Sequence, residues 1–174
     1  LAEDARVVDV GCGSGAIALA LAHLRPGLRL LATDVSAAAL TLTRENAARL
    51  GLGGRVEVAR GAYLEPVFAL GLAERVVAVV SNPPYVRPEE MARLAPEVLA
   101  EPHLALQSRS ADGLVEYREL AQQAARLPHL RWLGVEVGYG QAAAVREILA
   151  PLGHLRTLSD YGGIERHVMV RVWG

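Results

Sequence analysis

A glycine-rich loop between an apolar segment and a helical one is the feature that most restricts how this chain can fold. Residues 6–10 are mostly β-branched, as in a buried strand, and residues 16–22 are rich in alanine and leucine, as in a helix. The loop Gly11-Cys12-Gly13-Ser14-Gly15 lies between them. A second apolar run, residues 28–33, completes a strand–helix–strand unit at Asp34, and such a unit requires parallel strands.

The same alternation continues to the end of the chain. Further strands are predicted at residues 56–59, 76–80, 130–137, 154–159 and 167–172. Further helices are predicted from the cap Ser36 to about Leu50, from Asp112-Gly113 to about Leu127 and over residues 141–149, with an irregular or short helical link at 65–74. Prolines and the lack of a sustained period predict a long functional loop at residues 86–112, with one short helix near 89–94.

These elements predict an α/β fold with a mostly parallel sheet covered by helices on both faces. The last two strands are joined by residues 160–166, which is too short for a helical crossover, so the final strand is expected to be antiparallel. With 174 residues and 52% hydrophobic content, the chain can bury one sizeable core. A single domain over residues 1–174 is therefore expected.

Composition narrows the classes of function. The net charge is −1 and all 18 basic residues are arginine, which gives no broad basic surface for nucleic acid, although a local arginine patch stays open. The single cysteine, Cys12, excludes an internal disulfide and a cysteine-based metal cluster, and the five histidines show no metal-ligand spacing, so no metal is expected. Without an apolar run of membrane-spanning length or a signal peptide, a cytoplasmic protein is expected. A monomer is expected as well.

The glycine loop and Asp34 together indicate the kind of cofactor. The spacing Gly11-x-Gly13-x-Gly15 is not that of a dinucleotide fingerprint, and no lysine completes a phosphate-binding loop. Asp34 ends the second strand, where its carboxylate can accept both ribose hydroxyls. An adenosyl ligand without a pyrophosphate fits these features, and S-adenosylmethionine is the natural candidate. Taken alone, Asp34 is equally well explained as part of a helix cap with Ser36.

The acceptor side is predicted at Ser81-Asn82-Pro83-Pro84-Tyr85. The two prolines prevent the preceding strand from continuing, so the chain must turn there. Asn82 is left at the strand tip with an acceptor oxygen and a donor NH2 group on a stiff backbone. An ordinary turn is the alternative interpretation of an Asn-Pro pair. Asp9 is expected to anchor the glycine turn, and Cys12 is interpreted as a small loop residue and not as a nucleophile.

Several motifs together resemble a known family. They are the run 7–20, Asp34, Asn46, the run 81–86, Glu101-Pro102, the run 134–138 and Asp160-Tyr161-Gly162-Gly163 with Glu165-Arg166. In this combination the chain resembles the HemK-type protein-(glutamine-N5) methyltransferases that modify peptide chain release factors. The Asn-Pro-Pro-Tyr box is shared with DNA and RNA adenine-N6 methyltransferases, so it specifies methylation of an amino group and not the substrate. Glu101-Pro102 and the Asp-Tyr-Gly-Gly loop favour the glutamine enzymes.

The resemblance implies a Rossmann-like class I methyltransferase fold, S-adenosylmethionine as the cofactor, S-adenosylhomocysteine as the product and a release factor as the partner. The cofactor-binding residues it implies are Gly11, Cys12, Gly13, Ser14, Gly15, Asp34, Tyr63 and Asn82. The catalytic residues it implies are Asn82, Pro83, Pro84 and Tyr85. In this interpretation the Asn82 side-chain oxygen and the Pro83 carbonyl each accept one N–H of the substrate amide, and the Tyr85 ring stacks on it.

Two departures from the family pattern leave alternatives open. Family members carry a helical substrate-recognition domain before the catalytic one, and the 174 residues contain none. They also place an acidic residue near the adenine, where this chain has Gly61-Ala62-Tyr63, so adenine is expected to rely on backbone bonds and the Tyr63 ring. Glu101 either touches substrate or braces the turn, and Glu136 is expected to be a structural carboxylate. The alternatives in function are a nucleic-acid amino methyltransferase and a non-catalytic S-adenosylmethionine-binding module.

Overall fold

The computed structural model describes residues 5–173 and contains one seven-stranded sheet in the order β3-β2-β1-β4-β5-β7-β6. The strands are β1 (Arg6–Val10), β2 (Arg29–Asp34), β3 (Val56–Arg60), β4 (Val76–Ser81), β5 (Trp132–Glu136), β6 (Gly153–Ser159) and β7 (Glu165–Val172). β1 to β5 pair in parallel, whereas β7 is antiparallel to both β5 and β6. The predicted fold class, with an antiparallel last strand, is confirmed.

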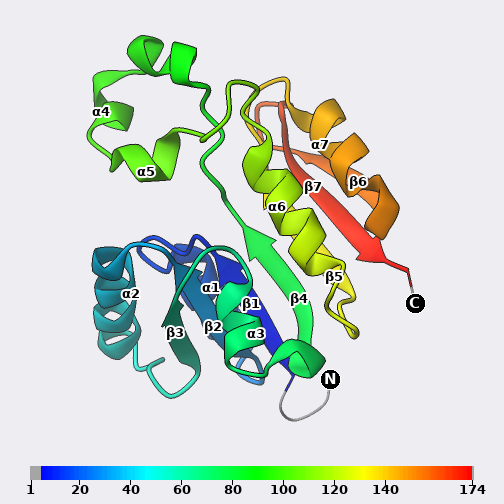
Figure 1. The fold of residues 1–174 in the computed structure, drawn as a ribbon. Coiled ribbons are helices and arrows are strands. Elements are labelled where there is room, and N and C mark those ends of the chain that lie inside the picture. The colour runs from blue at the N-terminus through cyan, green and yellow to red at the C-terminus, as the bar shows by residue number, and fades with distance from the viewer. Residues whose placement is uncertain (1–4, 174) are drawn as a thin grey trace.

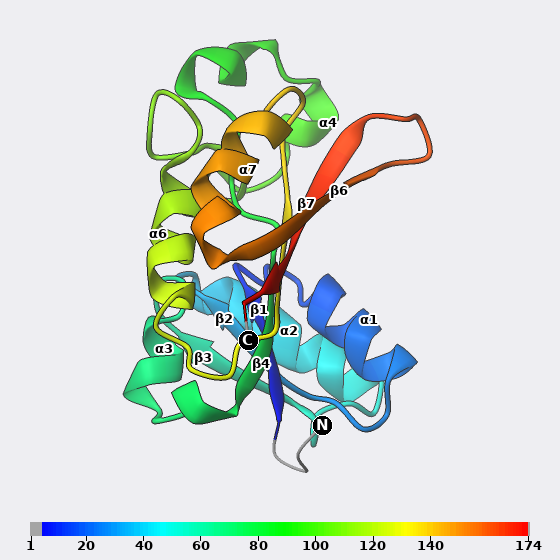
Figure 2. The same ribbon diagram turned by 90° about the vertical axis from the view of Figure 1, so that its right-hand side faces the viewer.

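Helices cover both faces of this sheet (Figures 1 and 2). The main ones are α1 (Ala16–Leu24), α2 (Ala37–Arg49), α3 (Glu65–Ala69), α6 (Val115–Ala124) and α7 (Ala142–Leu149). α1 and α2 share one core cluster with the sheet, and α3, α6 and α7 share a larger cluster on the opposite face. Two short 3-10 helices, η1 (Ala73–Arg75) and η3 (Ala150–Leu152), precede β4 and β6.

The chain leaves the sheet after β4 in a long excursion before α6. It holds three short helices, η2 (Pro88–Arg93), α4 (Pro96–Leu99) and α5 (His103–Leu106), which lie beyond the carboxyl end of β4 (Figure 1). The prediction of one helix near residues 89–94 is confirmed by η2, but the excursion contains more helix than expected. Pro96 occupies the first turn of α4 and Pro102 precedes α5, and proline is well suited to helix starts because its φ is already helical.

The remaining boundaries follow the predictions closely. Ser36 caps α2, since its Oγ accepts a hydrogen bond from the Ala39 N–H at 3.3 Å. α6 begins at Val115, three residues after the predicted start, because the Asp112 side chain accepts the Leu114 N–H at 3.1 Å and forms a turn instead. None of the helices in residues 5–173 combines the length and the hydropathy that a membrane span requires.

Candidate active site

Four neighbouring parallel strands end at the same level. Val10 of β1 pairs with Thr33 of β2 and with Ser81 of β4, and Ser81 pairs with Val135 of β5. The next residues lie at this one edge of the sheet: Asp34 and Glu136 end β2 and β5, and Gly11 and Asn82 directly follow β1 and β4. Because β2 and β4 flank β1, Asp34 and Asn82 lie about two strand spacings apart, or about 10 Å. The predicted cofactor and acceptor segments therefore meet at the carboxyl edge of the sheet.

The glycine loop is held open by its backbone conformation. Gly11, Gly13 and Gly15 have φ angles of 70°, 55° and 82°, which side-chain-bearing residues rarely adopt. A Cβ atom at Gly15 would lie 2.8 Å from Cγ2 of Thr43, so close packing of the loop on α2 also demands glycine there. A Cβ at Gly11 or Gly13 would meet nothing within 4 Å, so the loop faces open space. This loop can admit a ligand close to its backbone.

A backbone carbonyl of β2 and two side chains of α2 hydrogen-bond to the glycine loop. The Thr33 carbonyl oxygen accepts the N–H of Gly11 at 2.9 Å. The Thr43 hydroxyl donates to the Gly13 carbonyl at 3.0 Å, and the Asn46 amide donates to the Ser14 carbonyl at 3.0 Å. The loop is thus anchored to β2 and α2.

Asp34 has both a structural role and the position predicted for ribose binding. Its Oδ2 accepts the N–H of Gly13 at 3.0 Å and its Oδ1 accepts the N–H of Ser36 at 2.8 Å. The carboxylate therefore joins the glycine loop to the start of α2. Each oxygen retains a second lone pair, so these bonds are compatible with acceptance of hydroxyl groups.

Asp9 is buried, and its side chain hydrogen-bonds to the first turn of α1 and not to the loop residues 11–15, which it was expected to anchor. Its Oδ2 accepts the N–H of Ala18 at 2.9 Å, while its Oδ1 has no hydrogen-bond partner among the described residues. Burial raises the pKa of Asp9 to about 6, and the charge of Asp34 adds to this effect.

Cys12 is also buried, and its thiol lies 3.5 Å from the Thr43 hydroxyl. Burial raises the pKa of Cys12 to about 11. A thiol with this pKa is a poor nucleophile at neutral pH.

The Asn82-Pro83-Pro84-Tyr85 turn presents unused acceptors at the strand tip. The Ser81 hydroxyl donates to the Val10 carbonyl at 2.8 Å and fixes the end of β4 to β1. Asn82 is exposed, and its side chain makes no hydrogen bond within residues 5–173. The Pro83 carbonyl likewise accepts none among those residues. Neither predicted acceptor group is thus used by another group among the described residues.

Tyr85, the last residue of this turn, is half-buried. Its hydroxyl donates to Oε1 of Glu136 at 3.3 Å, and desolvation together with the Glu136 carboxylate raises the pKa of Tyr85. Glu136 is in turn fixed through its backbone carbonyl, which accepts the Tyr117 hydroxyl at 3.0 Å. The expectation of a structural carboxylate at Glu136 is consistent with these bonds, but the carboxylate reaches a residue of the predicted site. A pocket of about 310 Å³ opens beside Tyr85, lined by residues of the segments 85–94 and 138–141.

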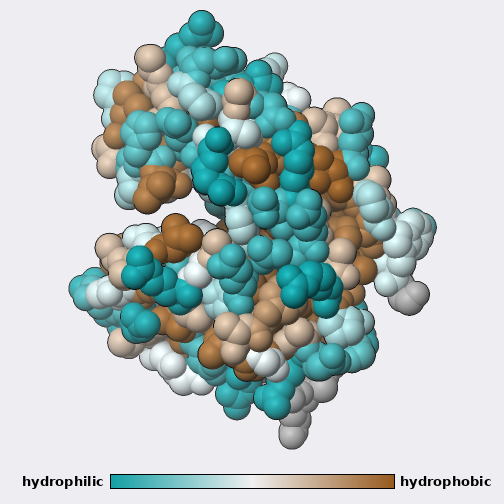
Figure 3. Space-filling view, in the orientation of Figure 1, coloured by the Kyte–Doolittle hydropathy of each residue, from teal (hydrophilic) through white to brown (hydrophobic). Residues whose placement is uncertain are grey.

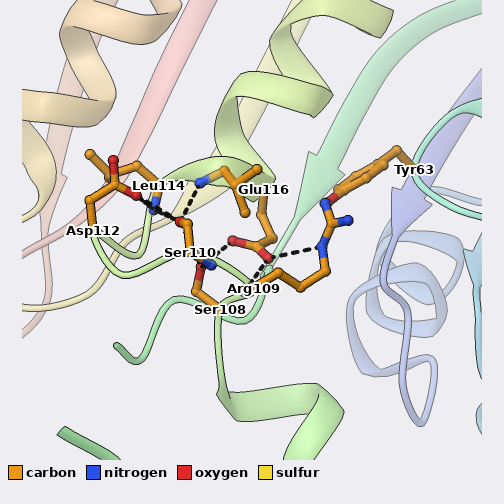
Figure 4. Close-up of polar contacts among 8 residues, drawn as sticks. Tyr63, Ser108, Arg109, Ser110, Asp112, Leu114 and Glu116 are labelled. Carbon is orange, nitrogen blue, oxygen red and sulfur yellow. Dashed lines mark hydrogen bonds and ion pairs between the residues drawn. The ribbon is translucent and has the colours of Figure 1, made fainter. Parts of the chain in front are cut away.

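Tyr63 connects the cofactor side to the excursion after β4. It is the one non-glycine residue with positive φ, 51°, in the described chain, and its carbonyl accepts the buried Thr33 hydroxyl at 3.0 Å. Arg109 donates to the Tyr63 hydroxyl at 2.6 Å, and its Nε lies 3.5 Å from a carboxylate oxygen of Glu116 (Figure 4). Glu116 is buried and also accepts the Ser108 hydroxyl at 2.5 Å and the Arg109 N–H at 3.0 Å.

These contacts connect the excursion after β4 to Tyr63, one of the residues predicted to bind the cofactor. The space-filling view shows the surface hollowed between the excursion and the region of α2 and β3 (Figure 3). Glu101 is exposed on the excursion and its side chain makes no hydrogen bond among residues 5–173, although its charge contributes to raising the pKa of Tyr85. No three His, Cys, Asp or Glu side chains gather as metal ligands in the described part of the chain.

Three residues at the site were missed from the sequence. Arg109 and Glu116 lie in or next to a segment without periodicity, and no local pattern predicts that they meet Tyr63. Gln141 was assigned only as the start of a helix, but its side chain reaches the Tyr85 carbonyl at 3.1 Å. The signal that could have found Glu116 is its place on the apolar face of α6, beside Tyr117 and Leu120, where an unpaired carboxylate would be costly.

Comparisons with known proteins identify the family of this chain. The family model of the Methyltransferase small domain matches residues 1–131. A release factor glutamine methyltransferase from Moorella thermoacetica is 43% identical over 170 residues, which are 94% of this chain and 58% of the relative. Relatives with the same name from Gloeobacter violaceus and Cereibacter sphaeroides are each 44% identical, and the matches cover 97% of this chain and 59% and 60% of theirs. The chain thus spans about three fifths of the length of these relatives.

Solved structures with the same fold are more distant in sequence. The catalytic domain of human METTL16, solved with an RNA hairpin, has a TM-score of 0.73 at 16% identity, covering 98% of this chain and 65% of that one. The METTL16 N-terminal domain solved with SAH has a TM-score of 0.69 at 15% identity, covering 98% and 62%. At this level of identity the likeness concerns the fold alone.

Proposed function

Because the chain belongs to the Methyltransferase small domain family, we propose that it transfers a methyl group from S-adenosylmethionine to the side-chain amide nitrogen of a glutamine in a peptide chain release factor. The observation that carries the proposal is the pair of unused acceptors at Asn82 and Pro83, level with the open glycine loop. The choice of a release factor is supported by the names of relatives at 43–44% identity. We further propose that the protein acts in the cytoplasm as a monomer, without strong binding to nucleic acid.

The residues at the carboxyl edge of the sheet fit S-adenosylmethionine. The loop of Gly11, Cys12, Gly13, Ser14 and Gly15 would hold the methionine part against its backbone, and Asp34 would accept the ribose hydroxyls. Tyr63 would border the adenine, supported by Arg109 through the 2.6 Å hydrogen bond and by the guanidinium group 5.7 Å from the ring centre. When bound, the cofactor supplies an electrophilic methyl group on a sulfonium.

Asn82 and Pro83 would orient the acceptor. A glutamine amide nitrogen is a weak nucleophile because its lone pair is delocalised into the carbonyl. If the Asn82 oxygen and the Pro83 carbonyl each accept one N–H, both hydrogens are fixed and the lone pair is directed at the methyl group. Positive charge that develops on the nitrogen is then stabilised by two oriented carbonyl dipoles that need no rearrangement.

Tyr85 and Pro84 would complete the slot for the planar amide. The Tyr85 ring is half-buried, and its hydroxyl is held by Glu136, so the ring can form one wall. Proline at positions 83 and 84 fixes two φ angles, which limits the freedom of the turn before substrate arrives.

Transfer of label tests the proposal. The purified chain is incubated with S-adenosylmethionine carrying a labelled methyl group, together with either a release factor or a mixture of tRNA and rRNA. The proposal expects label in the release factor only. Label in the RNA and none in the release factor would overturn it in favour of nucleic-acid amino methylation, and absence of cofactor binding by calorimetry would overturn both enzymatic functions.

A further inference from the structure

The side chain of Gln141 joins three backbone segments around Tyr85. Its Nε2 donates to the Tyr85 carbonyl at 3.1 Å and lies 3.4 Å from the Gly113 carbonyl, while its Oε1 accepts the N–H of Gly138 at 3.0 Å. Gln141 is 7% exposed, so these hydrogen bonds are shielded from water. A buried amide with such partners fixes the relative positions of the segments that it bonds.

Gln141 stands at the start of α7 but does not cap that helix. It occupies the N-cap position, where a side chain usually accepts a hydrogen bond from the first turn, yet it makes no such bond. Its polar group is directed at the turn that follows β4 instead of at its own helix.

The peptide unit between Tyr85 and Val86 is held on both sides. Its carbonyl accepts from Gln141, and its N–H, which belongs to Val86, donates to the Leu106 carbonyl at 3.0 Å. Because a peptide unit is planar, two bonds on opposite sides fix its orientation. The two prolines that precede it have fixed φ angles, so this orientation also restricts where Asn82 and the Pro83 carbonyl point.

The ring of Tyr85 is held by the same loop after β5. Its hydroxyl donates to Glu136, and a Cβ atom at Gly138 would lie 2.9 Å from Cδ2 of the ring. The ring therefore packs directly on the glycine backbone. Residues 136–141 thus contact Tyr85 at its hydroxyl, its ring and its carbonyl.

We propose that Gln141 is a positioning residue for methyl transfer, which holds the Asn82-Pro83-Pro84-Tyr85 turn in the conformation that presents both acceptors to the substrate amide. This inference rests on the proposed function, since it assigns Gln141 to the acceptor part of that site. Gln141 hydrogen-bonds to neither the glycine loop nor Asp34. Its loss therefore lowers the rate of transfer and leaves cofactor binding unchanged.

The isosteric variant Gln141→Glu tests the inference most cleanly. When its carboxyl group is ionised, at a pH above its pKa, the variant keeps the acceptor for Gly138 but places a second oxygen against the Tyr85 carbonyl, so the turn is displaced. We expect kcat for methylation of a release factor to fall on the order of 10-fold to 100-fold, as for a misplaced reacting group, with an unchanged Kd for S-adenosylmethionine in calorimetry. If the Glu variant does not fold, Gln141→Met, which introduces no charge, should give the same result, a lowered kcat with an unchanged Kd for S-adenosylmethionine. Gln122→Glu is the matched control, because Gln122 is exposed on α6 and makes no hydrogen bond within residues 5–173.

Hydrogen exchange at the Val86 amide separates this inference from the proposed function. The Val86 N–H belongs to the peptide unit that Gln141 holds, so its exchange should be faster in the Gln141 variants than in the wild-type protein. In Gln122→Glu the exchange rate at Val86 should equal that of the wild type. This measurement needs no substrate. If the unchanged protein methylates no release factor, the proposed function fails, and exchange still decides whether Gln141 holds the turn. Unchanged exchange at Val86, or an unchanged kcat in an active protein, would overturn the inference.

Discussion

The two parts of the candidate site are built in different ways. In the cofactor part, which comprises residues 9–15, 33–46 and 63, polar groups already bond to one another through Asp34, Thr43 and Asn46. In the acceptor part, which comprises residues 82–85 and 136–141, the backbone is fixed by Gln141 while Asn82 at the tip is exposed and makes no hydrogen bond among the described residues.

The difference shows where the fold has already ordered the chain and where a ligand must supply the partner. The hydrogen bonds of Asp34, Thr43 and Asn46 in the cofactor part join residues 21 to 32 positions apart, because β1, α1, β2 and α2 are consecutive. The acceptor part joins β4 to the loop after β5, with 50 residues between Tyr85 and Glu136. Variants in the two parts should therefore separate binding of the cofactor from transfer of the methyl group.

The largest effect is expected at Asn82. Asn82→Ala removes one of the two predicted acceptors, and loss of a preorganised polar group of this kind costs about 10²–10³ in kcat. Single-turnover rates at saturating cofactor measure it. Asn46→Ala is the control from the cofactor part, because Asn46 is the other asparagine and bonds to the Ser14 carbonyl. It should weaken cofactor binding and leave the saturated rate near normal, so equal losses of rate in both variants would refute the separation.

Asp34→Asn should weaken the cofactor part alone. A charged acceptor for hydroxyl groups contributes about 1.5–3 kcal/mol, so the Kd of S-adenosylmethionine should rise about 10-fold to 100-fold. Titration calorimetry measures this, with Asp112→Asn, an exposed carboxylate before α6, as the control. An unchanged Kd would mean that Asp34 accepts hydrogen bonds only from the backbone N–H groups of Gly13 and Ser36.

Asp9 gives the cofactor part a dependence on pH. Its pKa is about 6 in the folded protein, above the value of about 3.9 for an unfolded chain, so the folded state binds more protons between these values. The free energy of unfolding should therefore fall as the pH rises from about 4 to about 6, by on the order of 2 kcal/mol, and then level off.

Urea denaturation of the unchanged protein and of Asp9→Asn across this pH range measures the effect. The difference in unfolding free energy between the two should change with pH, since the variant lacks the titrating group. A constant difference from pH 4 to pH 6.5 would show that Asp9 is not held with a raised pKa.

The smallest effect is expected at Arg109, where the excursion after β4 contacts Tyr63 of the cofactor part. Arg109 is an exposed side chain whose bonds to Tyr63 and Glu116 compete with water, and such pairs contribute about 0–1 kcal/mol. Arg109→Ala should change the Kd of S-adenosylmethionine by less than about fivefold. The control is Arg118→Ala, which removes an exposed ion pair between α6 and Asp112 and should have an equally small effect. A much larger change confined to Arg109 would show that its guanidinium group contacts the cofactor.

The fold could be predicted from local signals because those signals are strong in this chain. The β-branched run before Ser81, the cap at Ser36 and the two prolines after Asn82 each determine one element boundary by a mechanism that acts within a few residues. Because the parallel strands end at one level, the glycine loop, Asp34 and Asn82 lie at the same edge of the sheet.

Contacts between distant segments could not be predicted in this way. Gln141 and the Tyr85 carbonyl lie 56 residues apart, and Arg109 and Tyr63 lie 46 apart, so no periodicity or turn signal relates them. The helices α4 and α5 were missed because each has four residues, too few for a repeating apolar pattern.

Fragment-ion mass spectrometry of a methylated release factor tests the central claim most directly, because it locates the transferred methyl group on an atom. The account predicts one methyl group on the side-chain amide nitrogen of a glutamine, the planar NH2 group that Asn82 and Pro83 are built to hold. A methyl group on a carboxylate oxygen or on a lysine amine, neither of which is a planar amide, would contradict it.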